Sequence, residues 1–332
     1  MTTTKIKTAR VLQALATAAL FLLASWAVRT AAAEPYPTQV VTLVLPYSAG
    51  TGIDIAARLL AERMQQRLKQ PVIIENRVGA GGNIGSTFVA KAKPDGYTLL
   101  LVANTLAMSP SLYDLSYDPV TSFVPIGLFL KGAMVLVVNR DVKASTTAEL
   151  IALTKTSPGK LNYGSPGLGT PQHLAMELFK STSGIDVMHV PYKGAGEAMI
   201  GMIRGENDMM FAAAQSALPN IGDGRIRALG ISSPVPLPLI AHLPTIATQI
   251  GDPDFNVDLW YGLFAPAGTP QAIVKILNDE IKAIAAMPSV QERLNSLALI
   301  PAASSPDELG RLLQKDIDRW STIIRQADIA KR

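Results

Sequence analysis

The pattern of apolar and polar residues near the start of the chain predicts two successive units of strand, loop and helix. Residues 40–45 are mostly apolar, as in a buried strand, and a loop with glycines follows at residues 46–52. Apolar side chains then recur at steps of three and four over residues 53–68, which predicts a helix with one apolar face. A second apolar run at residues 72–74 leads into a glycine-rich loop at residues 75–86 and a short helix.

The alternation of strands and helices continues along the chain. Helices are indicated by Thr170-Pro171 at a start, Gly184 at an end, and two long amphipathic segments that follow Pro270 and Pro306. We expect a loop through the prolines between residues 110 and 125. Further strands are predicted at residues 97–102, 134–138, 161–165, 187–190, 209–212, 227–231 and 258–264.

This order predicts an α/β protein with two mixed or parallel sheets flanked by helices. We expect a first lobe from residues 34–137 plus 258–332 and a second lobe from residues 138–257. The chain would then cross twice between the lobes, and two crossings make a hinge. A hinge with anion-binding loops beside a cleft is typical of a clamshell binding protein.

The first 33 residues are typical of a secretory signal peptide. Lys5, Lys7 and Arg10 precede an apolar core at residues 11–24, and three alanines end at Ala33. The apolar core is shorter than the roughly 20 residues that a membrane span needs. We therefore expect cleavage near Ala33 and export to the periplasm. Because the chain has no cysteine, it has neither a disulfide nor a cysteine for lipid attachment.

The charge of the mature chain argues against nucleic acid and anionic membranes as partners. Removing the leader removes four of the 30 Lys and Arg residues, which leaves 26 cations against 26 Asp and Glu residues. A formal charge of zero does not provide the basic field that those partners require. The three histidines lack the spacing of a zinc site, so we expect neither a metal nor a cofactor.

The two early loops suit an anion. Glycines permit positive φ and a close approach of the backbone, while the first amides of a following helix carry partial positive charge. Backbone amides and the hydroxyls of Ser48, Thr51 and Ser86 would then hold a carboxylate without a buried arginine. Each hydroxyl has an alternative role as an ordinary helix cap. Asp54 is expected to cap its helix rather than touch an anion.

Several ordered motifs resemble the exported substrate-binding proteins of tripartite tricarboxylate transporters, also called the Bug family. The resemblance covers essentially the whole mature chain. It departs from the usual pattern in the first loop, where Thr51 stands at a glycine position. The motifs lie at residues 75–85, 94–100, 117–119, 158–161, 189–194, 260–263 and 265–270.

The resemblance implies a two-lobed, type II-like periplasmic binding protein fold without catalytic activity. It implies a monomer that closes on a small carboxylate and delivers it to the membrane permease subunits of a tripartite tricarboxylate transporter. On this basis we assign the ligand site to Tyr47, Ser48, Ala49, Gly50, Thr51, Ala80, Gly81, Asn83, Ser86, Asn104, Ser165, Gly169, Thr170, Tyr192, Lys193 and Asp208.

Two other classes of function remain open from the residues. The same closure would let a loaded binding protein dock on a membrane sensor and serve signalling. A hydrolase is the weaker alternative: the sequence around Ser165 approaches a nucleophile elbow, but Pro166 removes the amide expected in an oxyanion hole. A dinucleotide enzyme is disfavoured because Gly79, Gly81 and Gly85 do not fit the Gly-x-Gly-x-x-Gly spacing.

Overall fold

A computed structural model describes residues 36–234 and 238–331. The predicted signal peptide at residues 1–33 therefore lies outside the described residues. Contacts divide the chain into two units, Met1–Thr38 and Gln39–Arg332. In the first unit the described residues include a cis peptide bond between Tyr36 and Pro37. All that follows concerns the second unit.

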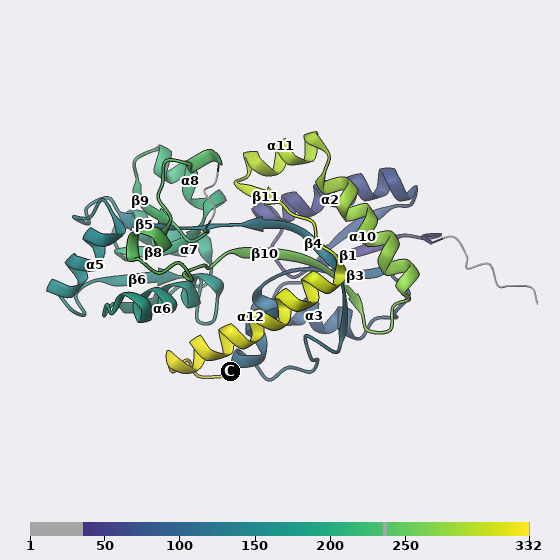
Figure 1. Cartoon of the computed structure of the whole chain (residues 1–332), viewed down its shortest axis with the longest axis horizontal. Helices are drawn as coiled ribbons and strands as arrows, with labels where there is room; N and C mark the ends of the chain where they lie inside the picture. Colours follow the sequence, from purple (N-terminus) through teal and green to yellow (C-terminus); the bar gives the residue numbers. More distant parts are fainter. Residues whose placement is uncertain (1–35, 235–237, 332) are drawn as a thin grey trace, which may run out of the picture. The chain divides into compact units, whose positions relative to one another are not determined.

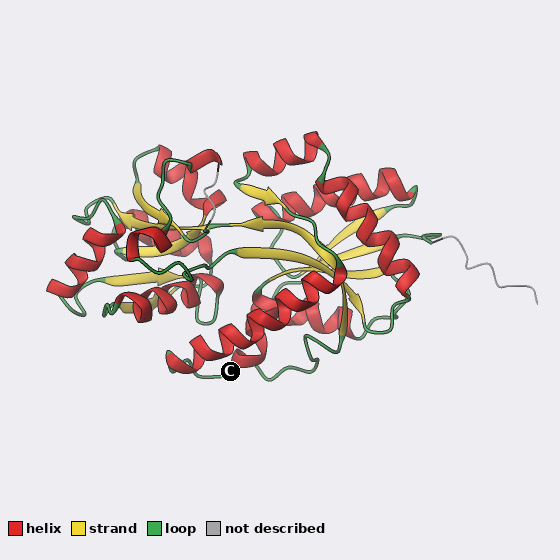
Figure 2. Ribbon diagram, viewed as in Figure 1, coloured by secondary structure: helices red, strands yellow, loops and turns green. Residues whose placement is uncertain are grey.

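Within the described residues, a six-stranded sheet has the order β11-β4-β10-β3-β1-β2 (Figures 1 and 2). Strands β1, β2 and β3 are parallel, whereas β10 runs antiparallel to both β3 and β4, and β11 antiparallel to β4. The sheet is therefore mixed. Its strands are β1 (Val41–Leu45), β2 (Val72–Asn76), β3 (Thr98–Ala103), β4 (Phe123–Gly132), β10 (Leu259–Pro266) and β11 (Leu299–Pro301).

Helices pack on both faces of this sheet and bury its central strands. Helix α10 contacts α2, β4 and α11, while α12 contacts β4 and α4, and α3 contacts β3 (Figure 1). Packing of both C-terminal helices against the first sheet agrees with the sequence pattern. These helices are α2 (Gly52–Leu68), α3 (Asn83–Ala90), α4 (Thr105–Leu112), α10 (Gln271–Ala285), α11 (Pro288–Ser296) and α12 (Pro306–Gln326).

A five-stranded sheet in the described residues has the order β7-β6-β8-β5-β9. Strand β5 pairs antiparallel with β8 and β9, while β6 pairs parallel with β7 and β8, so this sheet is also mixed. The strands are β5 (Met134–Asn139), β6 (Asn162–Ser165), β7 (Met188–Pro191), β8 (Met209–Ala213) and β9 (Ile226–Ile231). The helices are α5 (Thr147–Thr156), α6 (Pro171–Ser183), α7 (Ala195–Arg204), α8 (Ala214–Gly222) and α9 (Ile246–Ile250).

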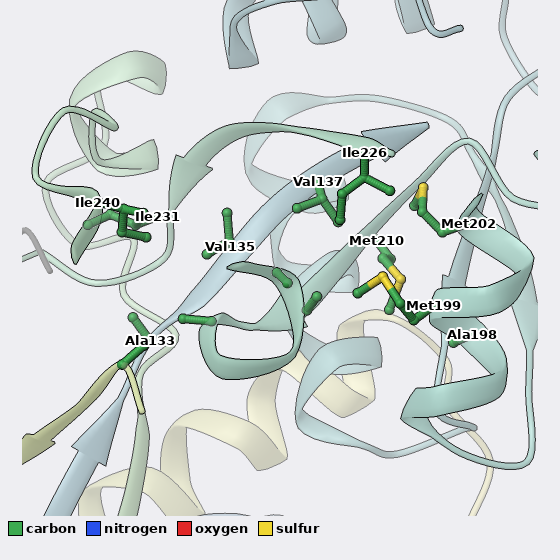
Figure 3. Packing of buried hydrophobic residues seen from close by; sticks show 14 residues of the cluster. Ala133, Val135, Val137, Ala198, Met199, Met202, Met210, Ile226, Ile231 and Ile240 are labelled. Carbon is green, nitrogen blue, oxygen red and sulfur yellow. The ribbon is translucent and has the colours of Figure 1, made fainter. Parts of the chain in front are cut away.

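The core of the second sheet lies between its strands and helices α7 and α8. Figure 3 shows Val135 and Val137 of β5 together with Met199 and Met202 of α7 and Met210 of β8. Burial of such side chains contributes roughly 1.5 to 3 kcal/mol each relative to exposure. This packing holds β5 and β8 against α7 and α8.

The expected loop between residues 110 and 125 is wrong at both ends. Pro110 lies inside α4, and Pro125 lies inside β4. Helix α4 tolerates its proline because it packs against α12 and buries Leu106, Met108 and Leu112. Pro125 pairs with Phe264 at a register shift, which is where an antiparallel strand accommodates a residue without an amide hydrogen.

Candidate functional site

One buried carboxylate in the first turn of α2 holds the loop between β1 and α2 in place. Asp54, which is 2 % exposed, accepts hydrogen bonds from the Gly50 amide at 3.0 Å and the Asn76 side chain at 2.9 Å. The Asn76 amide also donates to the Tyr47 carbonyl at 2.9 Å, so the loop is fixed to the end of β2. Arg58 completes the set with two bonds to Asp54, at 2.9 and 3.1 Å.

The electrostatics of Asp54 agree with its predicted capping role. Burial alone would raise the pKa of this carboxyl, but the hydrogen bonds from Arg58, Asn76 and Gly50 outweigh burial and lower it. Asp54 is therefore a fixed anion whose partners are already in place. The exposed residues of the loop are Ser48, Ala49, Gly50 and Thr51.

Thr51 is the N-cap residue of α2, but its side chain makes no capping hydrogen bond. Its hydroxyl instead donates to the Ser48 carbonyl at 2.9 Å. Ser86 behaves similarly in the second loop, because its hydroxyl donates to the Gly82 carbonyl at 3.1 Å. Both hydroxyls therefore have local backbone partners in this structure.

The glycine-rich loop forms a short 3-10 helix, η1 (Ala80–Gly82), directly before α3. Its backbone has positive φ from Gly79 to Gly82, including 48° at Ala80. A side chain at Gly85 would place its Cβ 3.1 Å from both the Arg77 carbonyl oxygen and the Pro46 side chain. The glycines therefore let the second loop pack directly against the first, so the structure brings the two predicted anion loops together.

Two buried amide side chains beside these loops have an atom without a hydrogen-bond partner among the described residues. Asn83, at the start of α3, accepts a bond from the Tyr117 hydroxyl at 2.7 Å, but its side-chain nitrogen has no partner. Asn104, at the end of β3, donates to the Asp258 carbonyl at 3.0 Å, but its side-chain oxygen has none. Because buried polar atoms normally have partners, each of these two atoms is a candidate for a bond to water or to a ligand.

The turn between β6 and α6 is held together mainly by its own residues. The Ser165 hydroxyl lies 2.7 Å from His189 Nε2 and accepts a bond from the Gly167 amide at 3.1 Å. The Thr170 hydroxyl donates to the Gly167 carbonyl at 2.8 Å, and the Gly169 amide donates to His173 Nδ1 at 3.1 Å. These bonds fix the turn as a single piece.

Two histidines, His173 on α6 and His189 on β7, pack beside this turn as structural residues. The ring of His189 stacks between Tyr163, at 4.6 Å between centroids, and His173, at 4.3 Å. Burial lowers the pKa of His189 to about 4, so its ring is neutral at pH 7. Ser165 is 0 % exposed, so this serine and histidine do not form an accessible nucleophile pair.

The turn meets the first sheet's loops around a cavity of about 40 Å³. Three predicted site residues are brought together in its lining: Gly81, Gly169 and Thr170. Contact is close here, because a Cβ on Gly169 would lie 2.7 Å from the Leu112 side chain. The complete lining is Gly81, Thr105, Met108, Ser109, Leu112, Tyr113, Leu168, Gly169 and Thr170.

The other thirteen predicted residues are not part of this lining in the described structure, among them Tyr192, Lys193 and Asp208 of the second sheet's region. The Tyr192 hydroxyl accepts a bond from Asn207 at 3.2 Å and lies beside Gly201 in the α7 packing. Lys193 is exposed, and its amide donates to Glu197 at 3.2 Å. The Asp208 carboxylate accepts a bond from the Asn162 amide at 2.8 Å and thereby joins β6 to β8.

Several cavity residues have no signal in the sequence because they lie on α4, the helix that contains Pro110. Thr105, Met108 and Leu112 belong to this group. Gln215, at the start of α8, was also missed: its Cγ lies 2.9 Å from the position of a Cβ on Gly52. The side-chain oxygen of Gln215 is buried and has no partner among the described residues.

A larger groove of about 440 Å³ lies elsewhere, between α4 and the end of α12. Its lining includes Pro110, Ser111, Arg325 and Lys331, and none of the predicted site residues. The described residues contain no group of three His, Asp or Glu side chains suited to a metal ion. None of the described helices is both long and apolar enough to cross a bilayer.

Known proteins resemble this chain over most of its length. Residues 56–329 match the model of the tripartite tricarboxylate transporter family receptor. A protein encoded in the tcbD-tcbE intergenic region of Pseudomonas sp. (strain P51) is 37 % identical over 88 % of this chain and 87 % of its own length.

Two solved structures carry a bound acid. An R. palustris protein with adipate has a TM-score of 0.81 and 32 % identity, covering 90 % of this chain and all of that one. MatC of Rhodopseudomonas palustris with bound malate has a TM-score of 0.76 and 31 % identity, covering 87 % of this chain and all of that one. The fold and the absence of catalytic function that the motifs imply are therefore confirmed, and the chain belongs to the tripartite tricarboxylate transporter receptor family.

Proposed function

We propose that this chain is an exported solute receptor that captures a small carboxylate by closure of two lobes and delivers it to a tripartite tricarboxylate-type permease. The observation that carries the proposal is the meeting of three loops at one place. The β1–α2 and glycine-rich loops adjoin each other, and the β6–α6 turn faces Gly81 across the cavity.

The first sheet would supply the donors for the carboxylate. The first turns of α2 and α3 present backbone amides with partial positive charge, and Asn83 adds a buried side-chain nitrogen without a partner among the described residues. Charge-assisted hydrogen bonds contribute roughly 1.5 to 3 kcal/mol each. A micromolar complex needs a binding free energy of about 8 kcal/mol in total. Several such bonds can therefore supply it without a buried arginine.

Closure is supported by how the chain passes between the sheets. One crossing joins β4 to β5 through Ala133, and the other leads from β9 to β10. We propose that these crossings act as a hinge between two lobes. The predicted lobes are residues 34–137 with 258–332 and residues 138–257, but β5 pairs with β8 and β9, so residues 134–137 belong with the second lobe. A cavity of about 40 Å³ holds no more than a few water molecules, so a dicarboxylate enters only if the β6–α6 turn moves away from α4.

The proposal is tested with the mature chain and a panel of mono-, di- and tricarboxylates. We expect a rise in melting temperature with at least one acid, a dissociation constant in the micromolar range or below, and a smaller radius of gyration by solution scattering. Stabilisation by nucleotides or cations alone would contradict the proposal. Binding without a change in radius would refute closure but retain carboxylate capture.

Delivery to a permease needs a separate measurement. Uptake of the bound acid by cells that carry the permease genes should require this chain, and adding it back should restore uptake. If uptake proceeds unchanged without the chain while carboxylate binding holds in vitro, the receptor serves another membrane partner.

A further inference from the structure

The cavity between α4 and the β6–α6 turn has a largely apolar wall. Met108 and Leu112 of α4 are 1 % and 3 % exposed, and Leu168 of the turn stands opposite with 38 % exposed. The lining contains no Lys, Arg or His side chain, and its polar members are uncharged. This wall lies next to Gly81 of the glycine-rich loop, where the proposed function places a carboxylate.

We propose that the solute is a carboxylate with an unsubstituted hydrocarbon body, and that this body lies against Met108, Leu112 and Leu168. The inference rests on the proposed function and specifies its substrate class. The hydroxyl groups of the lining lie on Thr105, Ser109, Tyr113 and Thr170. A solute hydroxyl on the carbons that face the three apolar side chains would lose its hydration without gaining a partner from them, which disfavours hydroxy acids. Hydrocarbon at the same place gains from burial.

The hydroxyl groups of Tyr47 and Thr105 form a hydrogen bond beside this wall. The Tyr47 hydroxyl accepts a hydrogen bond from the Ala103 amide at 2.8 Å and lies 3.1 Å from Thr105 Oγ1. Either hydroxyl can be the donor in this bond. Burial raises the pKa of Tyr47 to about 12, which keeps its hydroxyl hydrogen in place at neutral pH.

When Tyr47 is the donor in this bond, the Thr105 hydrogen is left for another acceptor. Thr105 lines the cavity, and its Oγ1 lies 4.0 Å from the position of a Cβ on Gly82. It is therefore next to the glycine-rich loop, where a carboxylate oxygen would accept its bond. Thr105 makes the carboxylate contact and Tyr47 is the positioning residue behind it.

The substrate class is tested with matched pairs of acids that differ by one hydroxyl group: succinate with malate, and butanoate with 3-hydroxybutanoate. Titration calorimetry on the mature chain should show that the unsubstituted acid of each pair binds about tenfold more tightly. Tighter binding of the hydroxy acids would overturn this inference while leaving the proposed function intact. If none of the panel carboxylates binds, the proposed function fails and the inference fails with it.

Variants of the wall separate its role in selectivity from its role in folding. Leu168→Asn should reduce the preference for succinate over malate to less than threefold, because the new amide can bond to the hydroxyl. Ile200→Asn on α7, which changes a side chain that is 49 % exposed, is the matched control and should keep the preference. An unchanged preference in Leu168→Asn would contradict the assignment of the wall.

The role of Thr105 is tested by a pair of substitutions with opposite effects on the hydroxyl. Thr105→Val keeps the shape but removes the donor, and should weaken binding of the best unsubstituted acid about tenfold. Thr105→Ser keeps the donor and should stay within threefold of wild type. Tyr47→Phe should weaken binding with little change in the succinate preference. Equal affinity of the Val and Ser variants would remove Thr105 from the site.

Discussion

The loops of the first sheet and the turn of the second sheet are stabilised in different ways. The β1–α2 loop is held from outside by Asp54 and Asn76, so Ser48 to Thr51 stay exposed. The β6–α6 turn is held by bonds among its own residues and to the stacked His173 and His189. The first arrangement leaves loop residues exposed to a solute, whereas the second holds Leu168 in a fixed turn. We infer that the first lobe contributes the donors together with Met108 and Leu112 of the wall, and that the second lobe contributes Leu168.

The largest expected effect is on the loop that depends on one carboxylate. Asp54→Ala removes the acceptor of the Gly50, Asn76 and Arg58 bonds and should lower the free energy of unfolding by roughly 2 to 3 kcal/mol. Denaturant unfolding measures this change. Acid titration of the wild type should show the same contribution disappearing as pH falls, because the folded pKa of Asp54 lies below its unfolded value.

A matched substitution keeps the shape of Asp54. Asp54→Asn should lose part of the stability and all of the acid dependence that the carboxylate contributes. If both variants unfold like the wild type, the loop is not held by this carboxylate, and the contrast between the two regions fails.

The next largest effect is the pH dependence of stability caused by Asp258, which lies where the chain returns from the second sheet to the first. Burial raises the pKa of Asp258 to about 6, and the neighbouring Asp316 raises it further, against opposing effects of Ser233, Lys131 and Arg319. A folded pKa above the ordinary 3.8 means that the contribution to stability is full below about pH 4 and is lost as pH rises through 6. Stability should therefore fall over this range by an amount on the order of 2 kcal/mol.

Asp258→Asn removes the titrating group and should flatten the dependence between pH 4 and pH 6, which unfolding at several pH values would measure. It should also be more stable than the wild type at pH 8. If Asp258→Asn keeps the full pH dependence of stability, another group titrates in this range and Asp258 does not cause the change.

A smaller effect is expected where the turn approaches α4. Gly169 has φ of 74°, and a Cβ there would lie 2.7 Å from Leu112. Gly169→Ala should weaken acid binding about tenfold, through roughly 1 kcal/mol of backbone strain and the displaced wall. Gly184→Ala, at a left-handed C-cap with nothing near its Cβ position, is the control for strain alone. Equal affinity of the two variants would mean that the turn is not in contact with the solute.

The smallest effect is expected at an exposed hydroxyl. Thr51→Val removes the bond to the Ser48 carbonyl and should weaken binding about threefold, because backbone amides supply most of the donors. Calorimetry with the best acid measures it. Unchanged affinity would show that the Thr51 hydroxyl acts only on the loop.

Local patterns predicted much of the fold but not its long-range parts. The period of apolar residues indicated α2, α10 and α12 because each buries one face, and short apolar runs indicated most strands. Strand order and the antiparallel direction of β10 depend on pairing between distant segments, which has no local signal. Helix α4 was missed because its packing on α12 outweighs the cost of Pro110.

For the candidate site, too, the sequence predicted the local features but not the contacts between distant segments. Glycine clusters and helix starts indicated the two anion loops, because they are local features of residues 46–54 and 79–85. Thr105 and Leu112 were not found, since their place in the cavity follows from the position of α4 against the β6–α6 turn. Gln215 was missed for the same reason: it approaches Gly52 only in the folded chain.

The most direct test of the central claim is a crystal structure of the mature chain with the acid that binds most tightly in the panel. The account predicts a carboxylate within hydrogen-bonding distance of the first-turn amides of α2 or α3 and of Thr105, with its carbons against Met108, Leu112 and Leu168. A carboxylate bound instead in the 440 Å³ groove beside Arg325 and Lys331, with the glycine loops unchanged, would contradict it.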